Sequence, residues 1–155
     1  MISRETDRML IGLAKIETGL SRIYEKLSGK PNFRPQVKSF WSELAKEEMV
    51  HAQVFNKIRE RVVSDDSFQF HVDSDMDSLK EFVDKARELV TKVETDISES
   101  DAYNLCARIE GELDEASFVD RIQMQDDVLN RKFSRVKADT RKHKMVLINY
   151  ARGIK

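Results

Sequence analysis

The segment VKSFWSELAKEEMVHAQVFNKI, residues 37–58, has the residue spacing of a long amphipathic helix. Its apolar residues recur at intervals of three or four, which places them along one face of a helix. That face is interrupted at its centre by Glu48 and His51, which are spaced i, i+3 and point the same way. A helix of this kind buries its apolar face against other helices, so the segment predicts a helical bundle with polar residues in its core.

Three other segments repeat this arrangement of apolar ends around a polar centre. They cover residues 10–27, 103–113 and 129–150. In the second of them an adjacent apolar face leaves the phase of the helix open. The polar positions at the centres of these segments are Glu17, Glu110, Thr140 and His143. If the four helices pack side by side, these groups meet at one level of the bundle.

Turn-forming residues are few, with 5 Gly and 2 Pro in 155 residues, and they mark where helices end. Both prolines lie in residues 28–35, which we expect to form a loop. Residues 64–78 are polar and irregular and predict a second loop, after which Ser78 begins a capping box. The sequence predicts four long helices and one shorter helix, the long ones at roughly 4–28, 36–63, 99–122 and 127–151 and the short one at 79–96.

These elements predict an all-α fold with a single domain over residues 1–155. The short helix lies in a long connection between the second and third long helices. Such a crossover allows those two helices to run parallel in a four-helix bundle. A chain of 155 residues is long enough to bury a core of this kind.

The composition argues against several classes of protein. A formal net charge of -1 gives no basic field for binding nucleic acid. No apolar run approaches the roughly 18 residues that a membrane-spanning helix needs, and the charged N-terminus does not resemble a signal peptide. The single cysteine, Cys106, cannot form an intrachain disulfide and suits a reducing compartment. We therefore expect a cytoplasmic protein that binds neither nucleic acid nor membranes.

Carboxylate and imidazole groups inside an apolar core need a partner. An ionised carboxylate is costly to bury unless it is paired, protonated or bound to a metal ion. Oxygen and imidazole ligands together suit iron, manganese or zinc. The candidate metal ligands are Glu17, Glu48, His51, Glu110 and His143. Two other interpretations stay open at this point: the helix phase differs from the one assumed, or the groups only pair with one another.

The sequence around these residues resembles the ferritin-like superfamily, specifically its rubrerythrin-like branch. The similar segments are ETGLSRIY at 17–24, LAKEEMVHA at 44–52, ARIEGEL at 107–113 and VKADTRKH at 136–143. The second of these is close to the family pattern L-x-x-E-E-x-x-H-A. Proteins of this family bind two irons between four helices. The resemblance implies two iron ions bridged by Glu48, with ligands at Glu17, Glu48, His51, Glu110 and His143.

Two features depart from the family. Thr140 stands where the family has a second glutamate that bridges the metals, so the site lacks one carboxylate. Asp139 is the neighbouring residue, but a rotation of about 100° per residue turns it away from that position. Family members that reduce peroxide usually carry a rubredoxin-like domain with four cysteines, whereas this chain has only Cys106. Any electrons would have to come from a separate partner.

The resemblance implies a metal-binding protein with a di-iron site weakened by Thr140. As an enzyme it would be a non-haem di-iron oxidoreductase that oxidises Fe(II) or reduces peroxide, and family members often form homodimers. The alternative is a metal-free structural or interaction bundle in which the same residues form an ion-pair network. A third interpretation is a bundle loaded with zinc or manganese and without redox turnover. Occupancy by two, one or no iron ions stays open.

Overall fold

The computed structural model describes residues 2–73, 76–116 and 118–153. Within these ranges helices make up most of the chain, which confirms the expected all-α class. The α-helices are α1 (Arg4–Ser28), α2 (Pro35–Ser64), α3 (Met76–Val93), α4 (Glu99–Ala116) and α5 (Asp127–Ala151). The remaining elements are a short 3-10 helix, η1 (Phe118–Arg121), and two short strands, β1 (Phe70–Val72) and β2 (Ile122–Met124).

Three of the predicted helices, α1, α2 and α5, agree with the sequence prediction to within one residue at each end. Local capping explains their starts. The side chain of Ser3 accepts a hydrogen bond from the backbone N–H of Thr6, and that of Asp126 accepts one from Val128. Pro35 occupies the first turn of α2, where its missing N–H costs no helical hydrogen bond.

The connections differ from the prediction in two places. The predicted helix at 99–122 is wrong in its last part, because α4 ends at Ala116 and β2 follows η1; residue 117 lies outside the described residues. The predicted loop at 64–78 contains β1, which pairs antiparallel with β2, and its residues 74–75 are also outside the described ranges. Its last residues, 76–78, belong to α3, so the short helix predicted at 79–96 begins and ends three residues earlier than expected, and Ser78 lies within it rather than before it. In β2 the side chains alternate between buried and exposed, which is the period of a strand.

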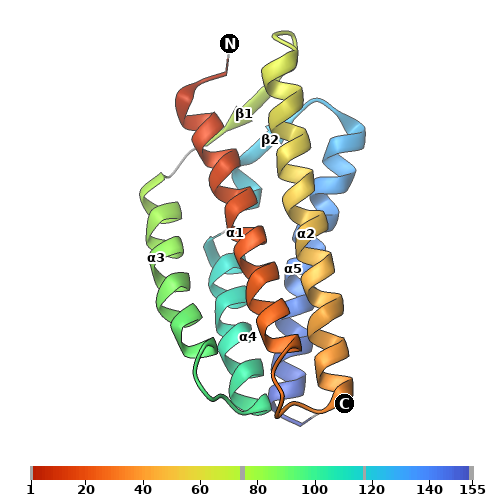
Figure 1. Cartoon of the computed structure of the whole chain (residues 1–155). Coiled ribbons are helices and arrows are strands. Elements are labelled where there is room, and N and C mark those ends of the chain that lie inside the picture. Colours follow the sequence, from red (N-terminus) through yellow and green to blue (C-terminus); the bar gives the residue numbers. More distant parts are fainter. Residues whose placement is uncertain (1, 74–75, 117, 154–155) are drawn as a thin grey trace.

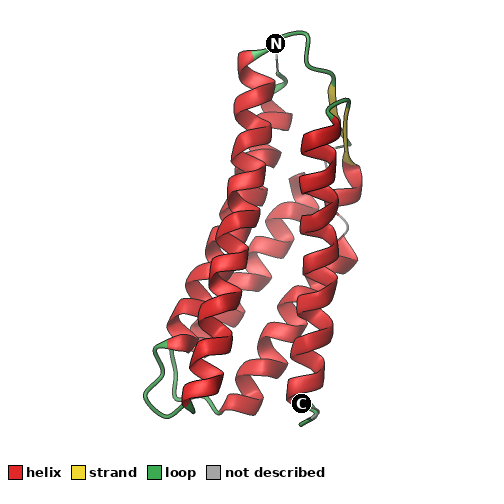
Figure 2. Ribbon diagram, turned by 90° about the vertical axis from the view of Figure 1, so that its right-hand side faces the viewer, coloured by secondary structure: helices red, strands yellow, loops and turns green. Residues whose placement is uncertain are grey.

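The helices run along a common direction, and the two strands lie at one end of them (Figures 1 and 2). The most extensive packing is between α1 and α2 and between α4 and α5. The two pairs meet where α2 contacts α5, and α3 lies against α1 and α4 (Figure 1). The predicted short helix α3 has 18 residues, the same length as α4. No helix in the described ranges is both long and apolar enough to cross a membrane.

Close packing of α3 on α1 depends on Gly12. A Cβ atom at this position would lie 2.5 Å from Cδ2 of Leu79, which is closer than two carbon atoms can pack. Glycine at this point therefore leaves room for the side chain of Leu79 from α3.

The interior is apolar towards both ends of the helices and polar in the middle. Trp41 and Leu27 lie towards one end, and Leu10 and Phe55 towards the other, all without exposed surface. Among the described residues, the buried polar or charged side chains are Glu17, Ser21, Glu48, His51, Glu110, Thr140 and His143. The hydroxyl of Ser21 donates a hydrogen bond to the carbonyl of Ala45. The other six side chains are the polar residues that interrupt the apolar faces of the helices.

Candidate metal centre

All five predicted ligands lie in the core and come together at one level of the bundle. Four helices supply them: α1 gives Glu17, α2 gives Glu48 and His51, α4 gives Glu110 and α5 gives His143. None of these residues is more than 3% exposed, so none relies on bulk water to solvate its polar atoms. The helix phases read from the sequence, including that of the segment around Glu110, are therefore confirmed.

The five side chains form two groups that share Glu48. One group is Glu17, Glu48 and His51, and the other is Glu48, Glu110 and His143. In each group the residues offer one ligand atom apiece, and these atoms all lie within 4.8 Å of one another. Either group can hold a metal ion.

The two oxygens of Glu48 face opposite histidines. Its Oε2 atom lies 3.0 Å from Nδ1 of His51, and its Oε1 atom lies 2.8 Å from Nδ1 of His143. The other carboxylates are slightly farther away, with Glu17 3.9 Å from His51 and Glu110 3.7 Å from His143 between the same types of atom. Ligand atoms about 2.1 Å from a common ion stand about 3 to 3.5 Å apart, close to these separations. Glu48 is therefore placed to bridge two ions.

Several of these atoms lack a hydrogen bond. Within the described residues, Oε2 of Glu17, Oε1 of Glu48 and Nδ1 of His143 are buried and have no hydrogen-bond partner. The last two atoms are 2.8 Å apart, but their directions do not suit a hydrogen bond. An unsatisfied buried polar atom costs about 1–3 kcal/mol. A cation in the first group would satisfy the Glu17 oxygen, and one in the second group would satisfy the other two atoms, so the residues fit metal ions.

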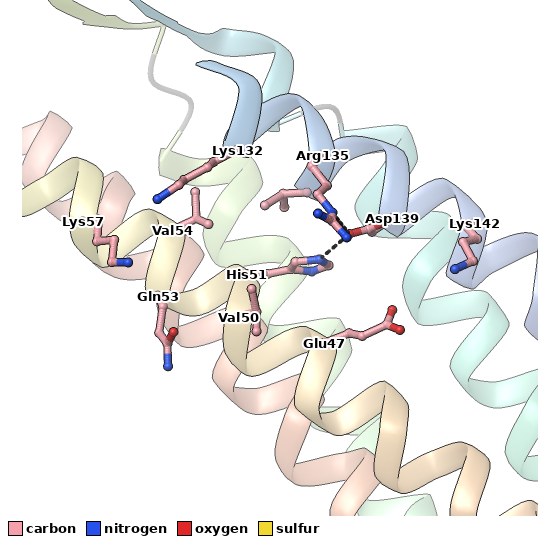
Figure 3. Close-up of a pocket in the computed structure, with 11 residues that line it drawn as sticks. Glu47, Val50, His51, Gln53, Val54, Lys57, Lys132, Arg135, Asp139 and Lys142 are labelled. Carbon is pink, nitrogen blue, oxygen red and sulfur yellow. Dashed lines mark hydrogen bonds and ion pairs between the residues drawn. The ribbon is translucent and has the colours of Figure 1, made fainter. Parts of the chain in front are cut away.

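The outer nitrogens of both histidines contact carboxylates from the opposite helix. Nε2 of His51 on α2 lies 3.2 Å from Oδ2 of Asp139 on α5 (Figure 3). Nε2 of His143 on α5 lies 2.7 Å from Oε2 of Glu47 on α2. A carboxylate that accepts the Nε2 proton fixes the tautomer and leaves the Nδ1 lone pair free for a metal. The contacts therefore orient each imidazole toward the interior.

The positions of these two carboxylates relative to the histidines could have been found in the sequence, although the spacing of apolar residues does not identify them. Glu47 and Asp139 each stand four residues before a histidine, so they lie on the same side of their helices. Asp139 supplies no atom to either group. It lies at the edge of a groove of about 410 Å³ between α2 and α5, whose wall His51 also lines (Figure 3).

The cluster also binds protons tightly. Burial lowers the pKa of His51, but its contacts with Glu17 and Glu48 outweigh burial and raise that pKa to about 10. Burial likewise opposes the charge on His143, yet its contacts with Glu110 and Glu48 raise its pKa to about 11. Burial raises the pKa of Glu17 to about 8, against the opposing effect of His51. A metal ion must displace these protons, so its binding is expected to strengthen as the pH rises.

Tyr24 supports the second group from α1. Its hydroxyl donates a hydrogen bond of 2.5 Å to Oε1 of Glu110, and its ring stacks on Trp41 with the ring centroids 5.4 Å apart. Burial, followed by the charge of Glu110, raises the pKa of the phenol well above its usual value. The hydroxyl therefore keeps its proton and holds one oxygen of Glu110.

Thr140 supplies no ligand atom to either group. It is buried, and its hydroxyl donates a hydrogen bond of 3.0 Å to the carbonyl of Val136, one turn earlier in α5. The two groups therefore contain three carboxylates and two imidazoles, with no atom from position 140.

No family model, no curated protein and no solved structure matches the chain. Evidence about function therefore comes from the geometry and the chemistry of the buried glutamates and histidines.

Proposed function

We propose that this chain is a ferritin-like protein of rubrerythrin type that holds two iron ions in a four-helix bundle, with α3 as the extra helix of the crossover. The observation that supports it most strongly is the position of Glu48, buried between two histidines with one oxygen near Nδ1 of each. The first ion would be held by Glu17, Glu48 and His51, and the second by Glu48, Glu110 and His143.

The donor set supports iron or manganese over zinc. Carboxylates outnumber imidazoles, and the groups contain no thiolate. Burial raises the pKa of the Cys106 thiol, which keeps it protonated and outside both groups. Structural zinc sites are usually rich in cysteine and histidine, whereas carboxylate-rich sites suit iron and manganese.

Iron in such a donor set supplies one-electron redox steps toward oxygen or peroxide. The residues of this chain bind the ions and orient the ligand side chains. Glu47 and Asp139 fix the two imidazoles, Tyr24 holds Glu110, and the apolar side chains at both ends of the bundle exclude bulk water. The reaction we propose is therefore oxidation of Fe(II) or reduction of peroxide at a dry, carboxylate-lined centre.

A separate electron donor would meet this centre at the groove between α2 and α5. His51 lines the groove, and its rim carries the cationic side chains of Lys57, Lys132, Arg135 and Lys142 (Figure 3). These charges favour an anionic donor. We also propose a homodimer, supported by exposed apolar side chains outside this groove such as Val63 on α2 and Met145 on α5. Sedimentation analysis of the purified protein tests the homodimer.

The test of the proposal is metal analysis of protein purified from iron-replete cells without oxygen. We expect iron to copurify with the wild type and to be lost in Glu48→Ala, because Glu48 belongs to both groups. The control is Glu43→Ala, which removes an exposed glutamate of the same helix that pairs with Lys46 and belongs to neither group. Absence of iron from the wild type, or equal iron in both variants, contradicts the proposal.

The second candidate is a metal-free structural or interaction bundle. The short His–Glu contacts and the raised histidine pKa values support it, because protonated histidines can neutralise the buried carboxylates. It predicts that a chelator leaves the melting temperature unchanged and that Glu17→Gln is tolerated. A ferric pair also absorbs visible light whereas zinc does not, so the colour of the metal-loaded protein separates iron from zinc.

A further inference from the structure

A small cavity lies beside the two groups, next to Thr140. Its volume is about 20 Å³, and its inner wall is formed by Glu17, Thr140 and the apolar side chains of Leu13, Phe55 and Leu113. A buried water needs roughly 10–15 Å³ measured in this way. The cavity therefore has room for a water molecule or a group only slightly larger, but not for a larger ligand.

The cavity lies where α5 departs from the pattern of α2. Glu48 stands three residues before His51, and Thr140 stands three residues before His143. The i−4 positions of the two helices also correspond, because Glu47 and Asp139 contact the two histidines in the same way. Thr140 is thus the counterpart of Glu48 with a shorter side chain, so the space beside it lacks the carboxylate that α2 supplies.

The wall of this cavity contains an unpartnered ligand atom. Glu17 is 3% exposed, and its Oε2 atom has no hydrogen-bond partner within the described residues. The hydroxyl of Thr140 cannot donate to it, since its proton goes to the carbonyl of Val136. The cavity therefore borders a carboxylate of the first group, and a small polar ligand in it would lie beside the ion that Glu17 helps to hold.

We propose that this cavity binds a small oxygen-donor ligand, the size of a water molecule or a formate ion, which completes the metal coordination in place of the carboxylate absent at position 140. The inference rests on the proposed metal centre. The apolar walls of Leu13, Phe55 and Leu113 set the upper limit on ligand size.

The outer end of the cavity offers a route from solvent. Asp114, Asp120 and Lys137 line this end, and Lys137 forms an ion pair with Asp120. The pair joins η1 to α5 at the surface, and both side chains are partly exposed. Lys137 is the cationic residue of this wall, and its ammonium group is paired with Asp120.

The test measures the affinity of the full chain for Fe(II), without oxygen, by competition with a coloured chelator. Formate supplies a carboxylate without a side chain, and propionate supplies the same group on a chain too long for the cavity. We expect formate to tighten Fe(II) binding to the wild type by about tenfold, the usual scale for supporting groups at a metal site, and propionate to have no effect. By linkage, Fe(II) tightens formate binding by the same factor.

Three variants at position 140 separate a ligand site from a structural effect. Thr140→Glu supplies the carboxylate within the chain, and Thr140→Leu fills the cavity, so both are expected to lose the response to formate. Thr140→Ala enlarges the cavity and disturbs its packing least, and it is expected to respond to acetate as well as to formate. The matched control is Thr18→Leu, because the Thr18 hydroxyl makes the same bond one turn back, to the carbonyl of Ala14, but does not line the cavity.

The outcomes distinguish this inference from the proposed function. If formate does not change the affinity for Fe(II), or if Thr140→Leu still responds to formate, the inference is wrong and the proposed metal centre is not affected. A response shared equally by formate and propionate also overturns it, because the cavity then sets no size limit. If the wild type binds no Fe(II) in either condition, the proposed function is wrong and the inference falls with it.

Discussion

The two halves of the buried cluster are built alike from different helices. In the α1–α2 half, His51 lies 3.0 Å from Glu48 and 3.9 Å from Glu17. In the α4–α5 half, His143 lies 2.8 Å from Glu48 and 3.7 Å from Glu110. The two sets of distances are therefore nearly equal, although Glu48 lies on the same helix as His51 and on a different helix from His143.

The halves differ in how their own carboxylates are engaged. Oε1 of Glu110 accepts a hydrogen bond from Tyr24, whereas Oε2 of Glu17 has no partner within the described residues. A carboxylate oxygen that already accepts a hydrogen bond donates less electron density to a metal. We therefore expect the α1–α2 half to bind metal more tightly than the α4–α5 half, and the following measurements test this comparison.

Removing metal from both halves is expected to have the largest effect. Ions held at a thousand times their Kd stabilise the native state by about 4 kcal/mol, which corresponds to roughly 10 °C in Tm for a chain of this size. Calorimetry of the iron-loaded protein with and without a strong chelator measures the drop. An unchanged Tm supports the metal-free ion-pair bundle instead.

The pH dependence of metal binding is expected to differ between the halves. In the α1–α2 half, metal binding displaces protons from both Glu17 and His51, whose pKa values are about 8 and 10. In the other half it displaces a proton from His143, whose pKa is about 11. Each displaced proton contributes about a tenfold rise in affinity per pH unit below the pKa. Titration calorimetry between pH 6.5 and 8 should give the steeper rise for the α1–α2 half.

The metal-free protein is expected to respond to pH in the opposite direction. The folded-state pKa values of His51 and His143 are raised above 6.5, so their contribution to stability is complete below pH 6.5 and is lost as the pH rises through about 10 and 11. The chelator-induced drop in Tm should therefore grow with pH. A drop that shrinks with pH contradicts the assignment of these histidines as metal ligands.

Neutralising one carboxylate at a time tests the order of the two halves. Glu17→Gln is expected to weaken binding of the tighter ion by about 100-fold, and Glu110→Gln to weaken the other ion by about tenfold, because Tyr24 already occupies one oxygen of Glu110. A two-step titration of each variant resolves the ions. Equal losses in the two variants contradict the proposed difference.

The outer carboxylates are expected to give the smallest effects and to act across the helix pairs. Asp139 lies on α5 but contacts His51, and Glu47 lies on α2 but contacts His143. Asp139→Asn should therefore weaken the α1–α2 half by about tenfold, and Glu47→Gln the α4–α5 half by a similar factor. If each variant weakens the half on its own helix, the crossed contacts do not orient the imidazoles.

Hydrophobic periodicity predicted the helices and the buried polar positions because both depend on the same 3.6-residue repeat. Glu17, Glu48 and His143 interrupt apolar stripes, and a residue in such a stripe must face the core. Pairing of β1 with β2 was missed, since three-residue strands far apart in the chain carry little local signal. Two further features, the crossed contact of Asp139 with His51 and the cavity beside Thr140, depend on how two helices face each other, which a single helical pattern does not contain.

The most direct test of the metal centre is anomalous diffraction at the iron absorption edge from crystals of protein loaded with Fe(II). The account predicts two peaks, one on each side of the Glu48 carboxylate and each beside Nδ1 of one histidine, with the α1–α2 peak more fully occupied. A structure with no peak between these residues, and with Glu48 instead hydrogen-bonded to both imidazoles, would contradict it.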